Sequence, residues 1–97
     1  MKYLIYTKLG SVCPYCVKAL ALLDEQGVQH EEIKMPADEV TAYKAWFKNK
    51  FNVDIKTIPQ ILGLKSDDYN VITTSYIGGY SELVKHFDDI DKGVKLV

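Results

Sequence analysis

Both cysteines of this 97-residue chain lie in one tetrapeptide, Cys13-Pro14-Tyr15-Cys16, between an apolar run and a helical pattern. This position makes the tetrapeptide the turn from a buried strand into a helix. Pro14 suits the first helical position, where a backbone N–H would have no partner anyway. Cys13 then lies at the helix N-terminus, where the macrodipole and unpaired N–H groups favour a thiolate. The tetrapeptide therefore predicts a thiol–disulfide exchange site, with Cys13 as the attacking sulfur and Cys16 as the resolving one.

Two other interpretations of the cysteine pair stay open at this point. The two thiols could be buried and inert, although Pro14 between them argues against this. They could also form half of a zinc site, which needs two further ligands. His30 and His86 are the only histidines in the chain, so we predict no metal site.

Length and composition predict one soluble domain, spanning residues 1–97. The net charge of −1 gives no electrostatic reason to expect nucleic acid or an anionic membrane as a partner. No apolar stretch is long enough to cross a bilayer, and Lys8 interrupts the N-terminal run too early for a signal peptide. We therefore expect a cytoplasmic protein. In that reducing compartment a close cysteine pair is more often redox-active or metal-binding than structural.

Hydrophobic periodicity and turn residues predict seven elements in the order β-α-β-α-β-β-α. The first helix should bury a stripe of Cys16, Leu20 and Leu23, with Val17 and Ala21 beside it. Asp38 is the expected cap of the second helix. The fold class is α/β, with a parallel β-α-β unit, an antiparallel hairpin and helices on both faces of a four-stranded mixed sheet. The expected ranges are strand 3–7, helix 14–26, strand 28–34, helix 38–51, strand 58–62 and onward, strand 71–77 and helix 81–90; residues 91–97 stay unassigned.

Three motifs together resemble the glutaredoxin family, of the dithiol Cys-Pro-Tyr-Cys type within the thioredoxin fold. They are the cysteine tetrapeptide preceded by Lys8, then Thr57-Ile58-Pro59-Gln60, then Ile77-Gly78-Gly79-Tyr80-Ser81-Glu82. The resemblance covers about residues 1–89, and the three motifs at these separations are strongly specific. The loop between Lys8 and Cys13 is two residues longer than the family pattern. Loop lengths are similar to those of small phage glutaredoxins, which serve ribonucleotide reductase.

The resemblance implies a binding site for glutathione. It implies a cis Ile58–Pro59 bond, beside which the extended tripeptide could pair with the Ile58 backbone. The γ-glutamyl carboxylate would lie at the helix N-terminus after Gly78-Gly79. Lys8 and Lys56 are candidates for the glycyl carboxylate, and Lys44 and Lys48 are further ones. The residues expected to bind glutathione are Lys8, Tyr15, Thr57, Ile58, Pro59, Gly79, Tyr80, Ser81 and Glu82.

The expected activity is that of a glutathione-dependent thiol–disulfide oxidoreductase. Protein disulfides would be reduced through Cys13 and Cys16, and glutathione mixed disulfides through Cys13 alone. Glutathione is then a co-substrate, no cofactor is bound permanently, and the chain is a monomer with ribonucleotide reductase as a candidate partner. One alternative is a thioredoxin-type reductant fed by a flavoprotein reductase, although thioredoxins usually carry Trp-Cys-Gly-Pro-Cys. Another is a non-catalytic iron–sulfur protein, in which Pro14 would be unusual.

Overall fold

The computed structural model describes residues 1–91, and its elements follow the predicted order. A single 3₁₀ turn precedes the second helix. Most element ends differ from the expected ones by one or two residues, as is usual for boundaries read from a sequence. The elements are β1 (Lys2–Lys8), α1 (Pro14–Glu25), β2 (Gln29–Met35), η1 (Ala37–Glu39), α2 (Val40–Phe51), β3 (Gln60–Ser66), β4 (Ile72–Gly78) and α3 (Tyr80–Asp91).

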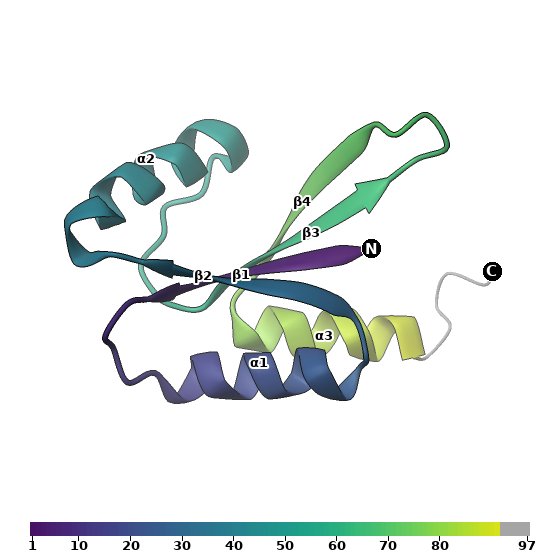
Figure 1. The fold of residues 1–97 in the computed structure, drawn as a ribbon, viewed down its shortest axis with the longest axis horizontal. Helices are drawn as coiled ribbons and strands as arrows, with labels where there is room; N and C mark the ends of the chain where they lie inside the picture. The colour runs from purple at the N-terminus through teal and green to yellow at the C-terminus, as the bar shows by residue number, and fades with distance from the viewer. Residues whose placement is uncertain (92–97) are drawn as a thin grey trace.

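The four strands form one mixed sheet in the order β2-β1-β3-β4. β1 pairs with β2 in parallel, while β3 runs antiparallel to both β1 and β4. Helices α1 and α3 cover one face of this sheet, and α2 covers the other (Figure 1). The predicted fold class, a four-stranded mixed sheet with helices on both faces, is therefore confirmed.

In the core under α1 and α3, β1 contributes every second side chain. Tyr3 and Ile5 point to this face, where they meet Ala19 and Leu23 of α1. The predicted stripe of α1 is partly wrong, because Val17 is 66% exposed. α1 packs against the sheet and α3 together, and this turns Cys16, Ala19 and Leu23 inward while Val17 and Ala21 face solvent.

The core under α2 is aromatic. Phe47 is fully buried, and its ring contacts the rings of Tyr6, Phe51 and Tyr76. The expected cap of this helix is wrong. Asp38 lies in η1, and Glu39, at the N-cap position, makes no capping hydrogen bond with its side chain. The start of α2 is therefore fixed by packing and by the 3₁₀ turn instead.

Two further boundaries matter for the site. β3 begins at Gln60 rather than Ile58, so the Ile58–Pro59 segment lies in a loop before the strand. α3 begins at Tyr80 rather than Ser81, which moves Ser81 into the first helical turn.

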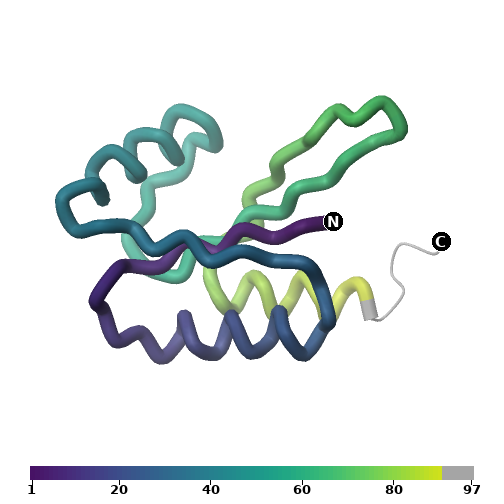
Figure 2. Tube along the Cα trace, viewed as in Figure 1, coloured from purple at the N-terminus to yellow at the C-terminus, as the bar shows by residue number. Residues whose placement is uncertain are grey.

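The β3–β4 hairpin extends past the rest of the sheet (Figure 2). Its turn is closed by Asp67, whose carboxylate accepts hydrogen bonds from two backbone N–H groups.

Candidate active site

Cys13 and Cys16 form a disulfide at the N-terminus of α1. Cys13 is the N-cap residue, and its Sγ accepts a hydrogen bond of 3.2 Å from the backbone N–H of Cys16. Cys13 is half-buried, whereas Cys16 is only 5% exposed. The backbone N–H that faces the Cys13 sulfur would stabilise negative charge there, so Cys13 is both the accessible sulfur and the one suited to be a thiolate.

The loop before β3 passes directly beside this disulfide. The Ile58–Pro59 peptide bond is cis, as predicted. The Ile58 carbonyl oxygen lies 3.9 Å from Cys13 Sγ. Gln60, only 4% exposed, holds the loop because its side-chain amide donates to the Thr57 carbonyl at 2.9 Å. Gln60 belongs to the motif Thr57-Ile58-Pro59-Gln60, but no role was expected for its side chain, because its burial exists only in the folded structure.

The N-terminus of α3 forms the opposite wall. Glu82 Oε1 accepts a 2.8 Å hydrogen bond from the Gly79 N–H, which is half of a capping box. Gly78 has a φ of 124°, and a Cβ there would lie 2.8 Å from Glu82 Cγ. Only glycine therefore fits at Gly78. The ring of Tyr80 lies 6.0 Å, centroid to centroid, from the ring of Tyr15 on α1, so the two helix starts meet.

Eight of the nine predicted glutathione-binding residues line one cavity of about 450 Å³. They come from three segments that are far apart in the sequence: the start of α1, the loop before β3 and the start of α3. The lining residues are Tyr15, Thr57, Ile58, Pro59, Gly79, Tyr80, Ser81 and Glu82. We call this cavity the α1–α3 groove.

Lys8 is the ninth predicted residue, and it lies next to the α1–α3 groove rather than in it. It lines a cavity of about 210 Å³ together with Lys44, Lys56, Thr57 and Ile58. Because Thr57 and Ile58 also line the groove, the three lysines lie at one end of it. Lys48, another candidate, forms an ion pair with Asp54 at 3.5 Å instead.

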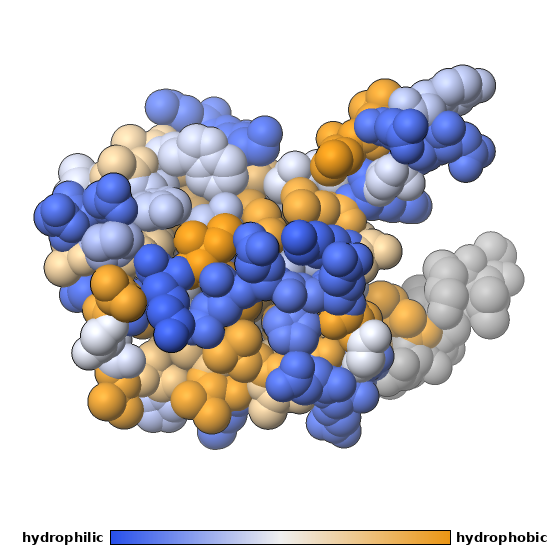
Figure 3. Space-filling view, in the orientation of Figure 1, coloured by the Kyte–Doolittle hydropathy of each residue, from blue (hydrophilic) through white to orange (hydrophobic). Residues whose placement is uncertain are grey.

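Exposed apolar side chains lie on both sides of Cys13 in the sequence. Val12 is 97% exposed, and Tyr15 and Val17 are more than half exposed. Hydrophobic residues also gather over α1 and the loop that precedes it on the face shown in Figure 3. An exposed apolar rim of this kind is suited to contact with another protein.

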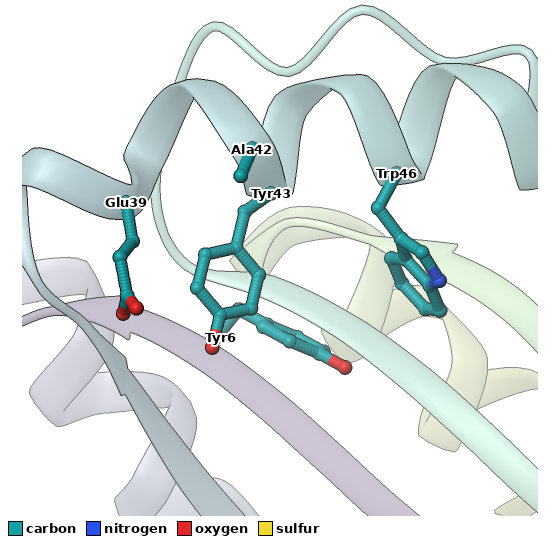
Figure 4. Close-up of a pocket in the computed structure, with 5 residues that line it drawn as sticks. All are labelled: Tyr6, Glu39, Ala42, Tyr43 and Trp46. Atoms are coloured by element: carbon teal, nitrogen blue, oxygen red, sulfur yellow. The ribbon is translucent and has the colours of Figure 1, made fainter.

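A separate cavity of about 350 Å³ lies beside α2, and no predicted site residue lines it. Glu39 of η1 and Tyr43 and Trp46 of α2 extend toward the sheet, where the ring of Tyr6 lies below them (Figure 4). Burial raises the pKa of Tyr6, and the neighbouring Tyr43 phenol and Glu31 carboxylate raise it further. This cavity is aromatic and contains neither cysteine.

The two histidines are engaged away from the cysteines. The His86 ring is hydrogen-bonded to the Tyr3 hydroxyl at 2.9 Å, and His30 Nε2 lies 3.2 Å from a carboxylate oxygen of Asp24. Burial lowers the pKa of His86, while the Asp89 carboxylate acts in the opposite direction.

Among residues 1–91, no group of three or more His, Cys, Asp or Glu side chains could hold a metal ion. No helix in this range could span a membrane.

Comparison with known proteins gives consistent matches. The family model described as glutaredoxin matches residues 4–63. Glutaredoxin 1 of Rickettsia bellii is 37% identical over 93 residues, which are 96% of this chain and 80% of that protein. Glutaredoxin 1 of Rickettsia felis is 49% identical over 61 residues, 60% of this chain and 53% of that protein.

Two solved structures have the same fold. The crystal structure of glutaredoxin 1 from Francisella tularensis, complexed with cacodylate, matches with a TM-score of 0.69 and 29% identity, over 94% of this chain and 96% of that one. The solution structure of glutaredoxin from Brucella melitensis matches with a TM-score of 0.58 and 29% identity, over 94% and 85% of the two chains.

Proposed function

Because this chain belongs to the glutaredoxin family and is a thiol–disulfide oxidoreductase with the thioredoxin fold, we propose that glutathione is its reductant and binds in the α1–α3 groove. The observation that carries this proposal is the convergence of eight expected residues on one cavity, among them Ile58, whose carbonyl oxygen lies 3.9 Å from Cys13 Sγ. Glutathione is an extended tripeptide with a carboxylate at each end. The groove offers a complementary group for each part of it.

The γ-glutamyl end would lie at the start of α3. The backbone N–H groups of Tyr80 and Ser81 belong to the first helical turn, where they have no partner within the helix. A carboxylate bound there gains from these donors and from the helix dipole. Glu82 is also at this end and would attract the α-amino group of the same residue.

The other parts of glutathione follow along the loop before β3. The Ile58 backbone would pair with the cysteinyl part of the tripeptide by strand addition, which brings the glutathione sulfur toward Cys13. The glycyl carboxylate would then reach the end of the groove with Lys8, Lys44 and Lys56. Three ammonium groups give this end a positive field that suits a carboxylate.

The reaction follows two routes. In the first, the Cys13 thiolate attacks a glutathione mixed disulfide, takes the glutathione sulfur and releases the substrate thiolate; a second glutathione then attacks and leaves as oxidised glutathione. In the second, Cys13 attacks a protein disulfide and Cys16 displaces the substrate, which gives the disulfide seen in the structure. The exposed Val12 and Val17 support contact with protein substrates.

We further propose a monomeric, single-domain cytoplasmic protein without a permanent cofactor. Ribonucleotide reductase is a candidate protein substrate because of the resemblance in loop lengths to small phage glutaredoxins. A visible absorption band in fresh anaerobic protein would point instead to the iron–sulfur alternative.

A coupled turnover assay tests the reductant. We expect turnover on a small mixed disulfide with glutathione and glutathione reductase, and little with thioredoxin reductase. The opposite result would establish the thioredoxin-type alternative. Lys56→Gln should raise the KM for glutathione, whereas Lys65→Gln, an exposed lysine on β3 outside the groove, is the matched control.

Amide chemical shifts test the position of glutathione. On titration with oxidised glutathione, the largest changes should occur at Tyr15, Thr57, Ile58 and residues 79–82. Changes centred on α2 would reject the α1–α3 groove as the binding site, whatever the turnover assay gives.

A further inference from the structure

The dithiol route requires Cys16 to lose a proton at the moment it attacks. Cys16 is 5% exposed on the buried stripe of α1, and burial disfavours a thiolate. The helix N–H that could stabilise a thiolate points to Cys13 Sγ, not to Cys16. Cys16 therefore needs a proton acceptor close by, and Glu82, the carboxylate of the α1–α3 groove, is held at the start of α3 by the Gly79 N–H.

A second cavity beside the disulfide contains such a group. Its volume is about 170 Å³, and both cysteines line it together with Thr7 and Glu32. This volume is enough for water molecules, and the lining is polar enough to hold them. Glu32 is the only carboxylate among its lining residues, within the part of the chain that the structure describes.

A buried hydroxyl holds the Glu32 carboxylate in position. Thr7 is 4% exposed, and its Oγ1 donates a 2.8 Å hydrogen bond to Glu32 Oε2. Side chains alternate along a strand, so Glu32 belongs to the α1 face of β2, while its neighbour Glu31 belongs to the α2 face. The parity of the strand thus sends one of two adjacent glutamates to the cysteines.

We propose that Glu32 accepts the proton of Cys16 in the resolving step, directly or through water in this cavity. The proposal rests on the dithiol route of the proposed function, but it does not require glutathione. The S–H bond of Cys16 breaks and its proton passes to the carboxylate. The sulfur electron pair forms the bond to Cys13, and the bond between Cys13 and the substrate sulfur breaks. Its electrons leave with the substrate as a thiolate.

When the Cys13–Cys16 disulfide is reduced again, Glu32 acts as a proton donor instead of an acceptor. When a reductant thiolate attacks Cys13 in the disulfide, Cys16 leaves with a negative charge, and the protonated Glu32 returns the proton to it. Lys8 and Lys34 are the other charged residues that line the cavity. Their ammonium groups favour the transient thiolate of Cys16.

A rapid-mixing experiment separates the two sulfurs. Reduced protein is mixed with a symmetrical aromatic disulfide whose released thiolate absorbs visible light. Attack by Cys13 releases the first coloured thiolate, and attack by Cys16 releases the second. Cys16→Ser should show the first phase only, which assigns the phases. No glutathione is present, so a failure here is distinct from a failure of the proposed reductant.

Glu32→Gln is the decisive variant, because glutamine keeps an oxygen for the Thr7 hydroxyl but cannot take a proton at neutral pH. Positioned general bases contribute roughly 10²–10⁴-fold to a rate. We set a lower threshold here and expect the second phase of Glu32→Gln to slow by at least about tenfold. Its rate should then rise about tenfold per pH unit, following the thiolate fraction of Cys16. Glu31→Gln, one residue away on the other face, is the matched control and should leave both phases unchanged.

The outcomes are distinct. A slow second phase with a new pH profile in Glu32→Gln alone supports the proposal. Thr7→Val, which frees the carboxylate, should then give a smaller slowing of the second phase. An unchanged second phase in Glu32→Gln overturns the proposal. So does an equal slowing in Glu31→Gln, or a proportional slowing of both phases, since each would report a general disturbance of the protein.

Discussion

The two faces of the sheet differ in what their helices contribute. On one face α1 and α3 run parallel, and both helices begin beside the disulfide (Figure 1). On the other face the single helix α2 covers an aromatic cluster around Phe47. Two helix N-termini favour negative charge, as a thiolate or a bound carboxylate, because N–H groups of the first turn have no acceptor within the helix. The aromatic face has no comparable convergence and supplies buried apolar area instead.

The difference indicates a division of roles within one small sheet. Chemistry lies at one end of the α1–α3 face, and much of the stability comes from the α2 face. Residues of α2 reach the site at one end, where Val40, Tyr43 and Lys44 line the cavity that also contains Lys8 and Lys56. Substitutions on the two faces should therefore separate activity from stability, which the following experiments examine.

The largest effect is expected at the disulfide itself. Cys13→Ser should abolish all exchange, because Cys16, the second of the two cysteines, is only 5% exposed. Cys16→Ser should keep the reduction of glutathione mixed disulfides and lose most reduction of protein disulfides. Parallel assays with a small mixed disulfide and a protein disulfide measure this. Equal losses in both assays for Cys16→Ser would contradict the two-route mechanism.

The second effect is on stability alone. Phe47→Ala should lower the free energy of unfolding by about 3–5 kcal/mol, because it removes a fully buried ring from the aromatic cluster. Urea unfolding measures this, and exchange activity of the folded fraction should stay near that of the wild type. Trp46→Ala, one residue earlier and 41% exposed, is the control with a smaller cost.

Phe47→Leu keeps more of the apolar volume and serves if Phe47→Ala does not fold. A Phe47 variant that is folded but has lost its thiol reactivity would show that the two faces are coupled, contrary to the division described above.

The third effect compares the starts of two helices. Glu82→Ala should cost about 0.5–2 kcal/mol, the usual range for a lost cap, because it removes the acceptor for the Gly79 N–H. Glu39→Ala, at the start of α2, should change stability by less than about 0.5 kcal/mol, because that side chain makes no capping bond. Thermal unfolding measures both, and equal losses would show that the cap of α3 has no special role.

The smallest effect is a pH dependence that arises on the α1–α3 face. Because burial lowers the pKa of His86 below 6.5 in the folded state, the unfolded chain binds the proton more readily. The contribution of neutral His86 is fully present above pH 6.5 and is lost as the pH falls through 6.5 toward the folded pKa. Unfolding between pH 7.5 and 5 should show this decline, and His86→Gln should lack it. A decline of the same size in the variant would assign it to other groups.

Local patterns in the sequence predicted most of the fold, and the resemblance to the glutaredoxin family named the eight residues that line the α1–α3 groove. The tetrapeptide with its proline marks the start of α1, and Gly78-Gly79 marks the end of β4 and the start of α3. Such signals act over a few residues, so they can be read without knowing what packs nearby. The errors occurred where packing decided. Val17 and Ala19 both fit a helical stripe, and the packing of α1 against the sheet and α3 buries Ala19 and leaves Val17 exposed.

The sequence alone thus determined the reaction type and the two sulfurs, because a cysteine pair around a proline at a helix start has a local chemical meaning. Tertiary structure decided what surrounds those sulfurs. The loop at Ile58 and the start of α3 reach the disulfide only because β1, β3 and β4 are adjacent in the sheet. Glu32 lines the cavity that Cys16 also lines, and Glu31 does not, because of the register of β2 on β1. Neither the approach of these segments to the disulfide nor the placement of Glu32 can be predicted from the hydrophobic pattern of the sequence. Contacts between distant segments depend on how the whole sheet assembles.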